Sequence, residues 1–130
     1  MILGVVTLLA QDPGAVAVAS SSAIDTLLIK KNMTGLHHPF HQHIFSGDQV
    51  KNGKPAPDLF LMAAERLGHD PAGCLVIEDS VNGVRAGLSA GMTVWGFTGG
   101  GHADENLESR LRGAGAHDVL PDFAAVRARL

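Results

Sequence analysis

The sequence predicts an α/β fold in which a parallel sheet is wrapped by helices. Three observations support this prediction. Short apolar runs alternate along the chain with segments whose apolar residues recur at helical spacing. The apolar runs show no polar alternation, which is typical of parallel strands that are covered on both faces. Polar residues gather directly after these runs, where parallel sheets bind their ligands.

Length and composition are those of one globular domain. The chain has 130 residues, 45% of them hydrophobic and 18% charged, so residues 1–130 are treated as a single domain. A formal net charge of -3 with scattered lysines and arginines argues against nucleic acid as a partner. No apolar run approaches the roughly 20 residues that span a bilayer, so no membrane partner is expected. The single cysteine, Cys74, fits a reducing, cytoplasmic location.

The first elements are predicted from apolar runs and the breaker residues between them. Residues 5–11 are expected to be the end of a helix, which the turn residues 12–14, Asp-Pro-Gly, would stop. Residues 15–19, Ala-Val-Ala-Val-Ala, form a continuous apolar run that predicts a buried strand. A helix is expected over 24–33 and a second strand over 43–46.

The rest of the chain continues the alternation of helix and strand. From Asp58 onward apolar residues recur at helical spacing, Pro57 suits the first turn of a helix, and Gly68 follows its end. Residues 74–77 form a third apolar strand, which ends at two acids. The remaining elements are expected in this order: a helix over 81–90, a strand over 93–97, a helix over 105–112, a strand near 119 and a helix from 123.

Glu78 and Asp79, which close the strand over 74–77, are the strongest candidates for chemistry. Two adjacent carboxylates repel one another unless a positive charge lies beside them. Mg²⁺ supplies such a charge and binds a few carboxylate oxygens, so the two acids predict a magnesium site. The structural alternative is that Asp79 caps the helix that begins near Val81.

Two further groups could bind a phosphate. Ser20, Ser21 and Ser22 follow an apolar strand, where hydroxyls and the N–H groups of a following helix can hold an anion. Serines are also common at such positions without any ligand. Two prolines fix the backbone around Lys54. Its ammonium could neutralise a phosphoryl group and a nearby carboxylate, or it could simply be solvated.

Together these motifs resemble the haloacid-dehalogenase superfamily, most closely its branch of β-phosphoglucomutase-like phosphatases. The order of the motifs is the family's: Ala-Val-Ala-Val-Ala-Ser ending at Ser20, Lys-Pro-Ala-Pro-Asp beginning at Lys54, and Val-Ile-Glu-Asp-Ser ending at Ser80. The resemblance implies a Rossmann-like three-layer α/β/α core and Mg²⁺-dependent attack by an aspartate on a small phosphorylated substrate. The implied site residues are, for catalysis, Ser20 and Lys54; for the phosphate, Ser20, Ser21, Ser22 and Lys54; and for the metal, Glu78 and Asp79.

The first motif of that family, Asp-x-Asp-Gly-Thr/Val, does not occur in the sequence. This motif carries the nucleophile, so no nucleophile is assigned, and the cap domain that selects the substrate is missing as well. The family's first strand lies at the centre of the sheet, so the core is expected to be incomplete there. We therefore expect a truncated or fragmentary hydrolase, or one part of a homo-oligomer or complex in which a second chain completes the sheet.

Other interpretations stay open at this point. The chain could be a catalytically inactive remnant that binds Mg²⁺, phosphate or a partner protein. A dinucleotide-binding module is disfavoured, because no Gly-x-Gly-x-x-Gly turn follows the first strand. Four histidines between residues 37 and 43 could bind a metal, and residues 98–101 could approach a phosphate, but both patterns also occur in ordinary polar loops.

Overall fold

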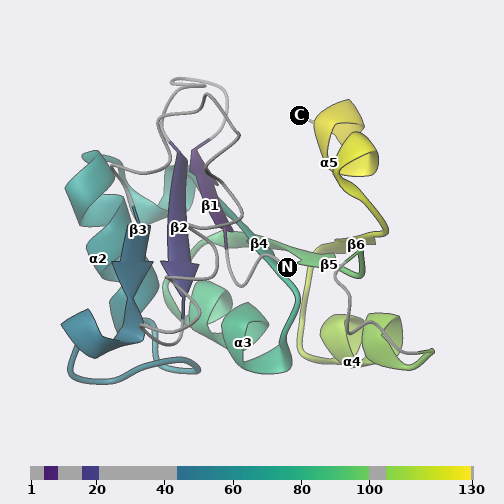
Figure 1. Ribbon diagram of the computed structural model, residues 1–130, viewed down its shortest axis with the longest axis horizontal. Helices are drawn as coiled ribbons and strands as arrows, with labels where there is room; N and C mark the ends of the chain where they lie inside the picture. Colours follow the sequence, from purple (N-terminus) through teal and green to yellow (C-terminus); the bar gives the residue numbers. More distant parts are fainter. Residues whose placement is uncertain (1–4, 9–15, 21–43, 100–104, 130) are drawn as a thin grey trace.

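The computed structural model describes residues 5–8, 16–20, 44–99 and 105–129, which form one six-stranded sheet and its flanking helices (Figure 1). The strands are β1 (Val5–Leu8), β2 (Val16–Ser20), β3 (Ile44–Ser46), β4 (Cys74–Glu78), β5 (Thr93–Phe97) and β6 (Asp118–Leu120). The helices are α2 (Asp58–Leu67), α3 (Val81–Ser89), α4 (Leu107–Gly113) and α5 (Phe123–Arg129), with 3₁₀ turns η2 (Gly47–Gln49) and η3 (Pro71–Gly73). The predicted α/β class is confirmed.

Most of the predicted elements are found within a few residues of their expected bounds. The strands predicted over 15–19, 43–46, 74–77, 93–97 and near 119 are β2, β3, β4, β5 and β6 in turn. The helices predicted from 58, over 81–90, over 105–112 and from 123 are α2, α3, α4 and α5. Gly68 ends α2 in the left-handed conformation, with a φ of 75° that a glycine adopts without strain. The helix predicted over 24–33 lies outside the described residues.

The N-terminal strand β1 corrects two predictions. Val5–Leu8 form a strand, so the prediction that a helix ends there is wrong. This strand pairs antiparallel with β2 on one side and with β4 on the other, so the centre of the sheet that was expected to be incomplete is occupied. The seven residues 9–15 between β1 and β2 are enough for a hairpin but too few for the crossover that a parallel neighbour requires.

The order of strands in the sheet is β3-β2-β1-β4-β5-β6, and the pairs β2–β3, β4–β5 and β5–β6 are parallel. Because β1 runs against both of its neighbours, β2 and β4 point in the same direction. Their carboxyl ends, at Ser20 and Glu78, therefore lie on one edge of the sheet. Val5 pairs with Val18 and with Ile77, so β1 begins at this same edge.

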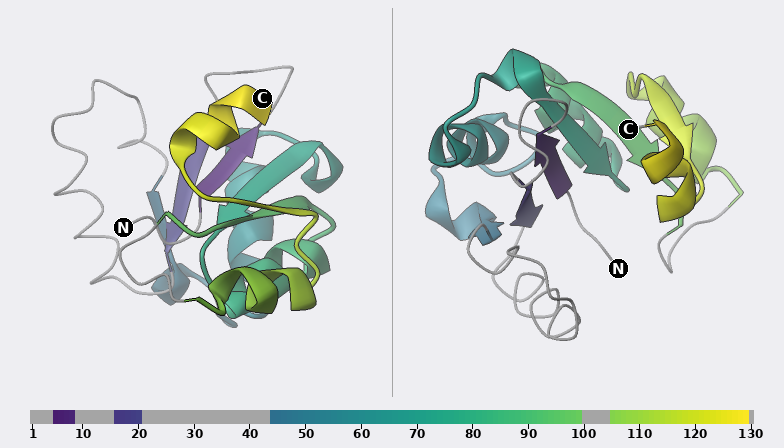
Figure 2. Two further views of the ribbon diagram at one scale, coloured as in Figure 1. Left: turned by 90° about the vertical axis from the view of Figure 1, so that its right-hand side faces the viewer. Right: turned by 90° about the horizontal axis from the view of Figure 1, so that it is seen from above.

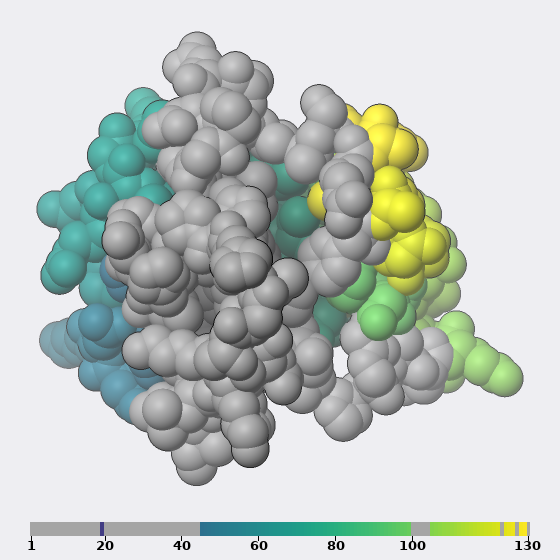
Figure 3. All heavy atoms as spheres, turned by 45° about the horizontal axis from the view of Figure 1, so that its top comes forward, coloured from purple at the N-terminus to yellow at the C-terminus, as the bar shows by residue number. Residues whose placement is uncertain are grey.

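Helices cover both faces of the sheet. In the left view of Figure 2, α5 lies above the strands and α4 below them. The space-filling view of Figure 3 shows α2 in teal and α5 in yellow on opposite sides of the molecule. Within the described ranges, no helix combines the length and the apolar character that crossing a membrane requires.

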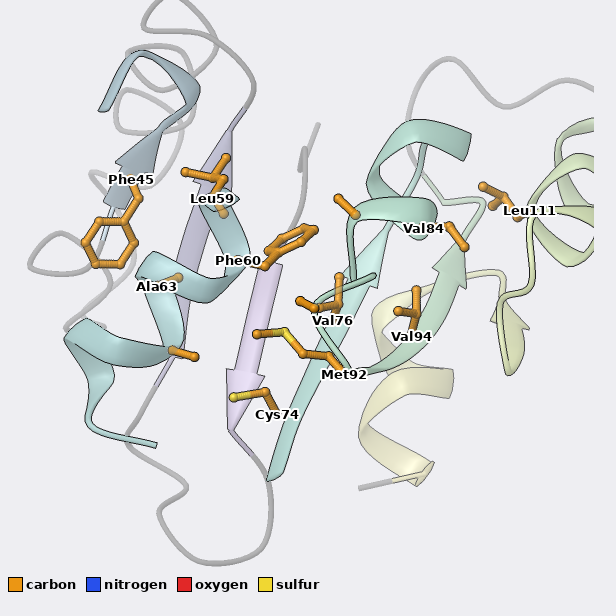
Figure 4. Packing of buried hydrophobic residues seen from close by; sticks show 14 of the residues in the cluster. Phe45, Leu59, Phe60, Ala63, Cys74, Val76, Val84, Met92, Val94 and Leu111 are labelled. Atoms are coloured by element: carbon orange, nitrogen blue, oxygen red, sulfur yellow. The ribbon is translucent and has the colours of Figure 1, made fainter. Parts of the chain in front are cut away.

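The larger hydrophobic core lies between the sheet and helices α2, α3 and α4 (Figure 4). Cys74 and Val76 of β4 and Val94 of β5 belong to it, together with the fully buried Phe60 of α2. The residues that alternate with these in β4 and β5 face the other side, where they pack against Val126 of α5. Burial of all five β4 residues on two covered faces explains why that strand shows no polar alternation.

Candidate functional site

Lys54 joins the ends of two strands through its ammonium group. Its Nζ atom donates to the carbonyl oxygen of Ala19 in β2 at 3.0 Å and to Oε2 of Glu78 in β4 at 2.9 Å. The Lys54 and Glu78 side chains are 3% and 1% exposed, so this is a buried ion pair. Nζ also lies 5.0 Å from the centre of the Phe60 ring, within the range of a cation–π interaction. Three residues from separate elements, Ala19, Phe60 and Glu78, therefore meet at one ammonium group.

The other carboxylate oxygen of Glu78 faces the start of α3. Oε1 accepts hydrogen bonds from the N–H of Asp79 at 3.2 Å and from the hydroxyl of Ser80 at 3.1 Å. Ser80 is also the N-cap of α3, where its Oγ accepts from the N–H of Gly83 at 3.0 Å. Both oxygens of Glu78 thus have protein partners, as the burial of a charged group requires.

Asp79 is the acid whose oxygen stays without a protein partner. Its Oδ1 atom is buried and has no hydrogen-bond partner in the described structure. Burial, and after it the neighbouring Glu78 carboxylate, raises the pKa of Asp79 to about 7, although the charge of Lys54 acts in the opposite direction. Ser80 caps α3, so the alternative in which Asp79 is the cap is wrong.

The chemistry of Asp79 fits a magnesium ion. A buried oxygen without a partner is unfavourable unless a cation or a donor meets it. Mg²⁺ is usually held by one or two carboxylates and keeps several waters or phosphate oxygens as its other ligands. Among the described residues, no three side chains of His, Cys, Asp or Glu gather into a metal-binding group. The Oδ1 atom of Asp79 is thus the described carboxylate oxygen that is available to such an ion.

The serines predicted to bind phosphate are only partly within the described ranges. Ser20 is the last residue of β2, directly after the carbonyl that Lys54 contacts, and it is in register with Ser46 of β3. Ser21 and Ser22 lie outside the described residues. The chain therefore brings the backbone of Ser20, Lys54 and the two acids to one edge of the sheet.

The two loop patterns of the sequence, the histidine cluster and residues 98–101, lie largely outside the described residues. The four histidines between residues 37 and 43 lie outside the described residues, as do Gly100 and Gly101. The N–H of Thr98 donates to the carbonyl of Leu120 at 3.0 Å, so it is used within the fold.

The sequence predicted that Lys54 meets a nearby carboxylate, but it did not identify Glu78 as that carboxylate. It also did not indicate the parts of Ser80 and Gly83 in holding Glu78. A signal was available for the pairing. A glutamate that continues an apolar strand is buried, and a buried carboxylate needs a positive partner or several donors. Lys54, which is followed by Pro55 and Pro57, was the cation whose position suggested that role.

Comparison with known proteins agrees with the motifs. The sequence profile of the haloacid dehalogenase-like hydrolases matches residues 2–91. A fructose-1-phosphate phosphatase of Escherichia coli is 44% identical over 80 residues, which are 62% of this chain and 41% of that protein. A bifunctional riboflavin kinase/FMN phosphatase of Arabidopsis thaliana is 63% identical over 51 residues, 39% of this chain and 14% of that protein.

Solved structures share the fold over most of the chain. A hydrolase of Deinococcus radiodurans, solved with bound phosphate and sodium, has a TM-score of 0.75 at 41% identity and covers 87% of this chain and 50% of its own. A candidate β-phosphoglucomutase of Thermotoga maritima has a TM-score of 0.69 at 32% identity, with the same coverage of 87% and 50%. The chain spans half or less of the length of these relatives. Since the profile match extends over more than half of its residues, the chain belongs to the haloacid dehalogenase-like hydrolase family.

Proposed function

We propose that the chain carries the phosphate-binding and metal-binding part of a phosphatase or phosphomutase site for a small phosphorylated metabolite. One observation carries the proposal: a buried ammonium group is held at the shared end of β2 and β4, beside an acid whose oxygen has no partner. The phosphatase names of the relatives support it, because fructose 1-phosphate and FMN are both phosphate monoesters.

Each residue has a role in this proposal. The ammonium of Lys54 has three N–H donors and uses two of them on Ala19 and Glu78, so one is left for a phosphoryl oxygen. Ser20 would donate its hydroxyl to another oxygen of the phosphate, with Ser21 and Ser22 beside it. The Lys54 ammonium is almost fully buried, so it would stabilise a negative charge that develops on the phosphate more strongly than it would in water.

Mg²⁺ is the cofactor that we propose for Asp79, with Glu78 beside it as the second acid. When bound, Mg²⁺ would neutralise charge on the phosphate and orient it for in-line attack. Glu78 already has both oxygens engaged by Lys54, Asp79 and Ser80, so Asp79 supplies the free carboxylate oxygen. The residues present therefore suit a metal held through Asp79 and its own waters.

The aspartate nucleophile of the family has no counterpart that we can assign in these residues. Neither β1 nor the four residues before it contain Asp or Glu, although β1 occupies the centre of the sheet. We propose that the nucleophile is supplied from outside the 130 residues, by a longer form of the protein or by a second chain. The limited share of its relatives that the chain spans supports this.

A second candidate function follows from the same strand. With β1 in the centre and no acid on it, the chain could bind phosphate and Mg²⁺ without turnover, as an inactive member of the family. A cytoplasmic location is part of either proposal. It is supported by Cys74, a buried free thiol. Burial, and after it the charge of Asp70, raises the pKa of this thiol to about 11, so the thiol stays protonated.

Phosphate release and phosphate binding, measured on the same purified chain, test these proposals. The assays are hydrolysis of p-nitrophenyl phosphate with and without Mg²⁺, and calorimetric titration with inorganic phosphate. We expect no turnover, and phosphate binding that Lys54→Ala weakens about tenfold or more, since a hydrogen bond to a charged group is lost. Asp79→Asn should remove the dependence of that binding on Mg²⁺.

The outcomes separate the alternatives. Turnover that disappears in both variants would mean that a carboxylate within the 130 residues is the nucleophile, contrary to our assignment. A folded chain that binds no phosphate with Mg²⁺ present would refute the proposed function. Turnover could also appear only when a longer protein or a second chain is supplied. That result would support the proposed enzyme site and exclude the inactive member of the family that only binds phosphate and Mg²⁺.

A further inference from the structure

Gly83, in the first turn of α3, lies directly against the carboxyl group of Glu78. A Cβ atom at position 83 would overlap three atoms of that side chain: Cγ, Cδ and Oε2. Oε2 is the oxygen that accepts the hydrogen bond from Lys54. The absence of a side chain at position 83 therefore provides the space in which the ion pair forms.

Glu78 has little freedom to move away from a larger residue at position 83. Its side chain is 1% exposed, and its Oε1 atom is held by the N–H of Asp79 and the hydroxyl of Ser80. The same hydroxyl accepts the N–H of Gly83, so the start of α3 and the carboxylate are fixed to each other. A methyl group at position 83 must displace the carboxylate from Lys54 or move α3 away from β4.

We propose that Gly83 is a positioning residue for Lys54. Gly83 acts through Glu78. Because residue 83 has no side chain, the first turn of α3 packs directly against the end of β4. The Glu78 carboxylate between them then holds the Lys54 ammonium at the ends of β2 and β4. The consequence for phosphate binding rests on the proposed function. The positioning itself does not, because it concerns only the contact of Lys54 with Glu78.

Gly87 offers a matched control on the same helix. It lies one turn after Gly83 and is also buried, and its Cβ would lie 2.6 Å from Cγ2 of Val94 and 3.3 Å from Cγ2 of Val76. Both glycines thus allow close packing of α3 on the sheet. Gly87 faces apolar side chains, whereas Gly83 faces the Glu78 carboxylate. Alanine at either position should therefore disturb the packing of α3, but only alanine at position 83 should disturb the position of Lys54.

The test is the NMR signal of the Lys54 ammonium protons in the 130-residue chain, assigned by its disappearance in Lys54→Arg. Buried, hydrogen-bonded ammonium protons exchange slowly with water, so we expect the signal in the wild type and in Gly87→Ala. We expect it to be lost in Gly83→Ala. The proposal is overturned if the signal persists in a folded Gly83→Ala protein, if Gly87→Ala loses it equally, or if the wild type lacks it.

Ser80→Ala keeps the test decisive if Gly83→Ala does not fold. This variant adds no atoms and removes the hydroxyl that links Gly83 to Glu78. The Glu78 carboxylate loses one hydrogen bond and is held less firmly against Lys54. The ammonium protons of Lys54 should therefore exchange with water roughly fivefold faster, the effect of one lost hydrogen bond. Unchanged exchange in Ser80→Ala would count against the proposal. Glu78→Asp provides a steric check, because the shorter acid should recover part of the melting temperature lost in Gly83→Ala and none of that lost in Gly87→Ala.

Phosphate titration of the same variants separates the two proposals. If both hold, Gly83→Ala weakens binding of inorganic phosphate about as much as Lys54→Ala does, by about tenfold, and Gly87→Ala leaves it near the wild-type value. If the wild type binds no phosphate but the ammonium signals behave as expected, the proposed function fails and the positioning stands. If phosphate binds and Gly83→Ala leaves both signal and affinity unchanged, the positioning fails alone.

Discussion

Two sets of ion pairs in this molecule differ in burial and in what they connect. Lys54 and Glu78 pair at 2.9 Å with side chains 3% and 1% exposed, at the carboxyl ends of β2 and β4, the two strands that flank β1. Two strands from β4, Asp118 of the edge strand β6 pairs with Arg129 of α5 at 2.7 Å and lies 3.9 Å from Arg112 of α4. There the arginine side chains are 51% and 58% exposed.

The difference shows that close ion pairs can have unrelated reasons to exist. Removing two charges from water costs several kcal/mol per ion, and their attraction offsets this only when the geometry is good. An apolar pair of similar size at Lys54 and Glu78 could be equally stable, so stability alone does not explain the pair. The exposed arginines cost little to desolvate and contribute little, about 0–1 kcal/mol per pair. The phosphate-binding role proposed for Lys54 would explain the buried pair, whereas the exposed pairs lie where α4 and α5 pack around β6.

The largest effect is expected when one member of the buried pair is removed. Lys54→Ala leaves the Glu78 carboxylate buried without its cation, which should lower the free energy of unfolding by about 3–5 kcal/mol at pH 7. Urea denaturation followed by circular dichroism measures this value. A loss below about 1 kcal/mol would mean that the pair is effectively solvated and that the contrast with the exposed pairs is false.

A double variant separates the stability of the pair from its function. Lys54→Met with Glu78→Leu replaces both charges by apolar side chains of similar length, so most of the stability lost in Lys54→Ala should return. Phosphate binding should not return with it, because the ammonium is gone. A double variant as unstable as Lys54→Ala would show that the pair is needed for the fold itself.

The next effect concerns Asp79 and pH. Its pKa is about 7 in the folded chain and near 3.8 when unfolded, so between these values the folded state binds more protons. Stability should therefore fall as the pH rises from about 4 to 7, and be lowest above 7. We expect the free energy of unfolding to fall by about 2 kcal/mol over this range. This is about half of the value that the full pKa shift corresponds to, because the side chain of Asp79 is partly exposed. Asp79→Asn should lack this dependence.

The measurement is the difference in free energy of unfolding between wild type and Asp79→Asn from pH 4 to pH 8, which cancels the contributions of other groups. A difference that does not change with pH would contradict the raised pKa. Mg²⁺ provides the complement, since it needs the ionised carboxylate. Mg²⁺ should raise the wild-type melting temperature more at pH 8 than at pH 5, and should leave Asp79→Asn unchanged.

Much of this fold could be predicted because its signals are local. The apolar runs of β4 and β5 and the helical spacing of α2 depend on neighbouring residues and were recognised from them. The role of Val5–Leu8 was not recognised, because a short, mostly apolar segment suits a helix or a strand equally well. What decides between them is tertiary: a place between β2 and β4 and a connection short enough for a hairpin.

The site was predictable in its residue types and less so in its contacts. Glu78 and Asp79 are adjacent in sequence and were treated as two equivalent acids. Their surroundings differ because Glu78 is the last residue of β4, whereas Asp79 lies in the bend between β4 and α3. Glu78 is enclosed with Lys54 and Ser80, while Asp79 keeps an oxygen without a partner among the described residues. The end of the apolar run indicates where the strand stops, but the partners of the two acids depend on α3 and on Lys54, which is 24 residues away.

The smallest effect is expected at the exposed ion pairs, where Arg129→Ala removes the 2.7 Å contact to Asp118. The Asp118 carboxylate stays partly in water and keeps the N–H of Val119, which donates to Oδ1 at 2.8 Å, so no buried charge is stranded. The loss should be below about 1 kcal/mol and should shrink further in 0.5 M NaCl, since salt screens exposed charges. Urea denaturation at low and high salt measures it, with Lys54→Ala as the reference whose loss salt should hardly change. A loss at Arg129 of several kcal/mol that persists in salt would show that α5 depends on this pair, and that burial does not distinguish the two regions.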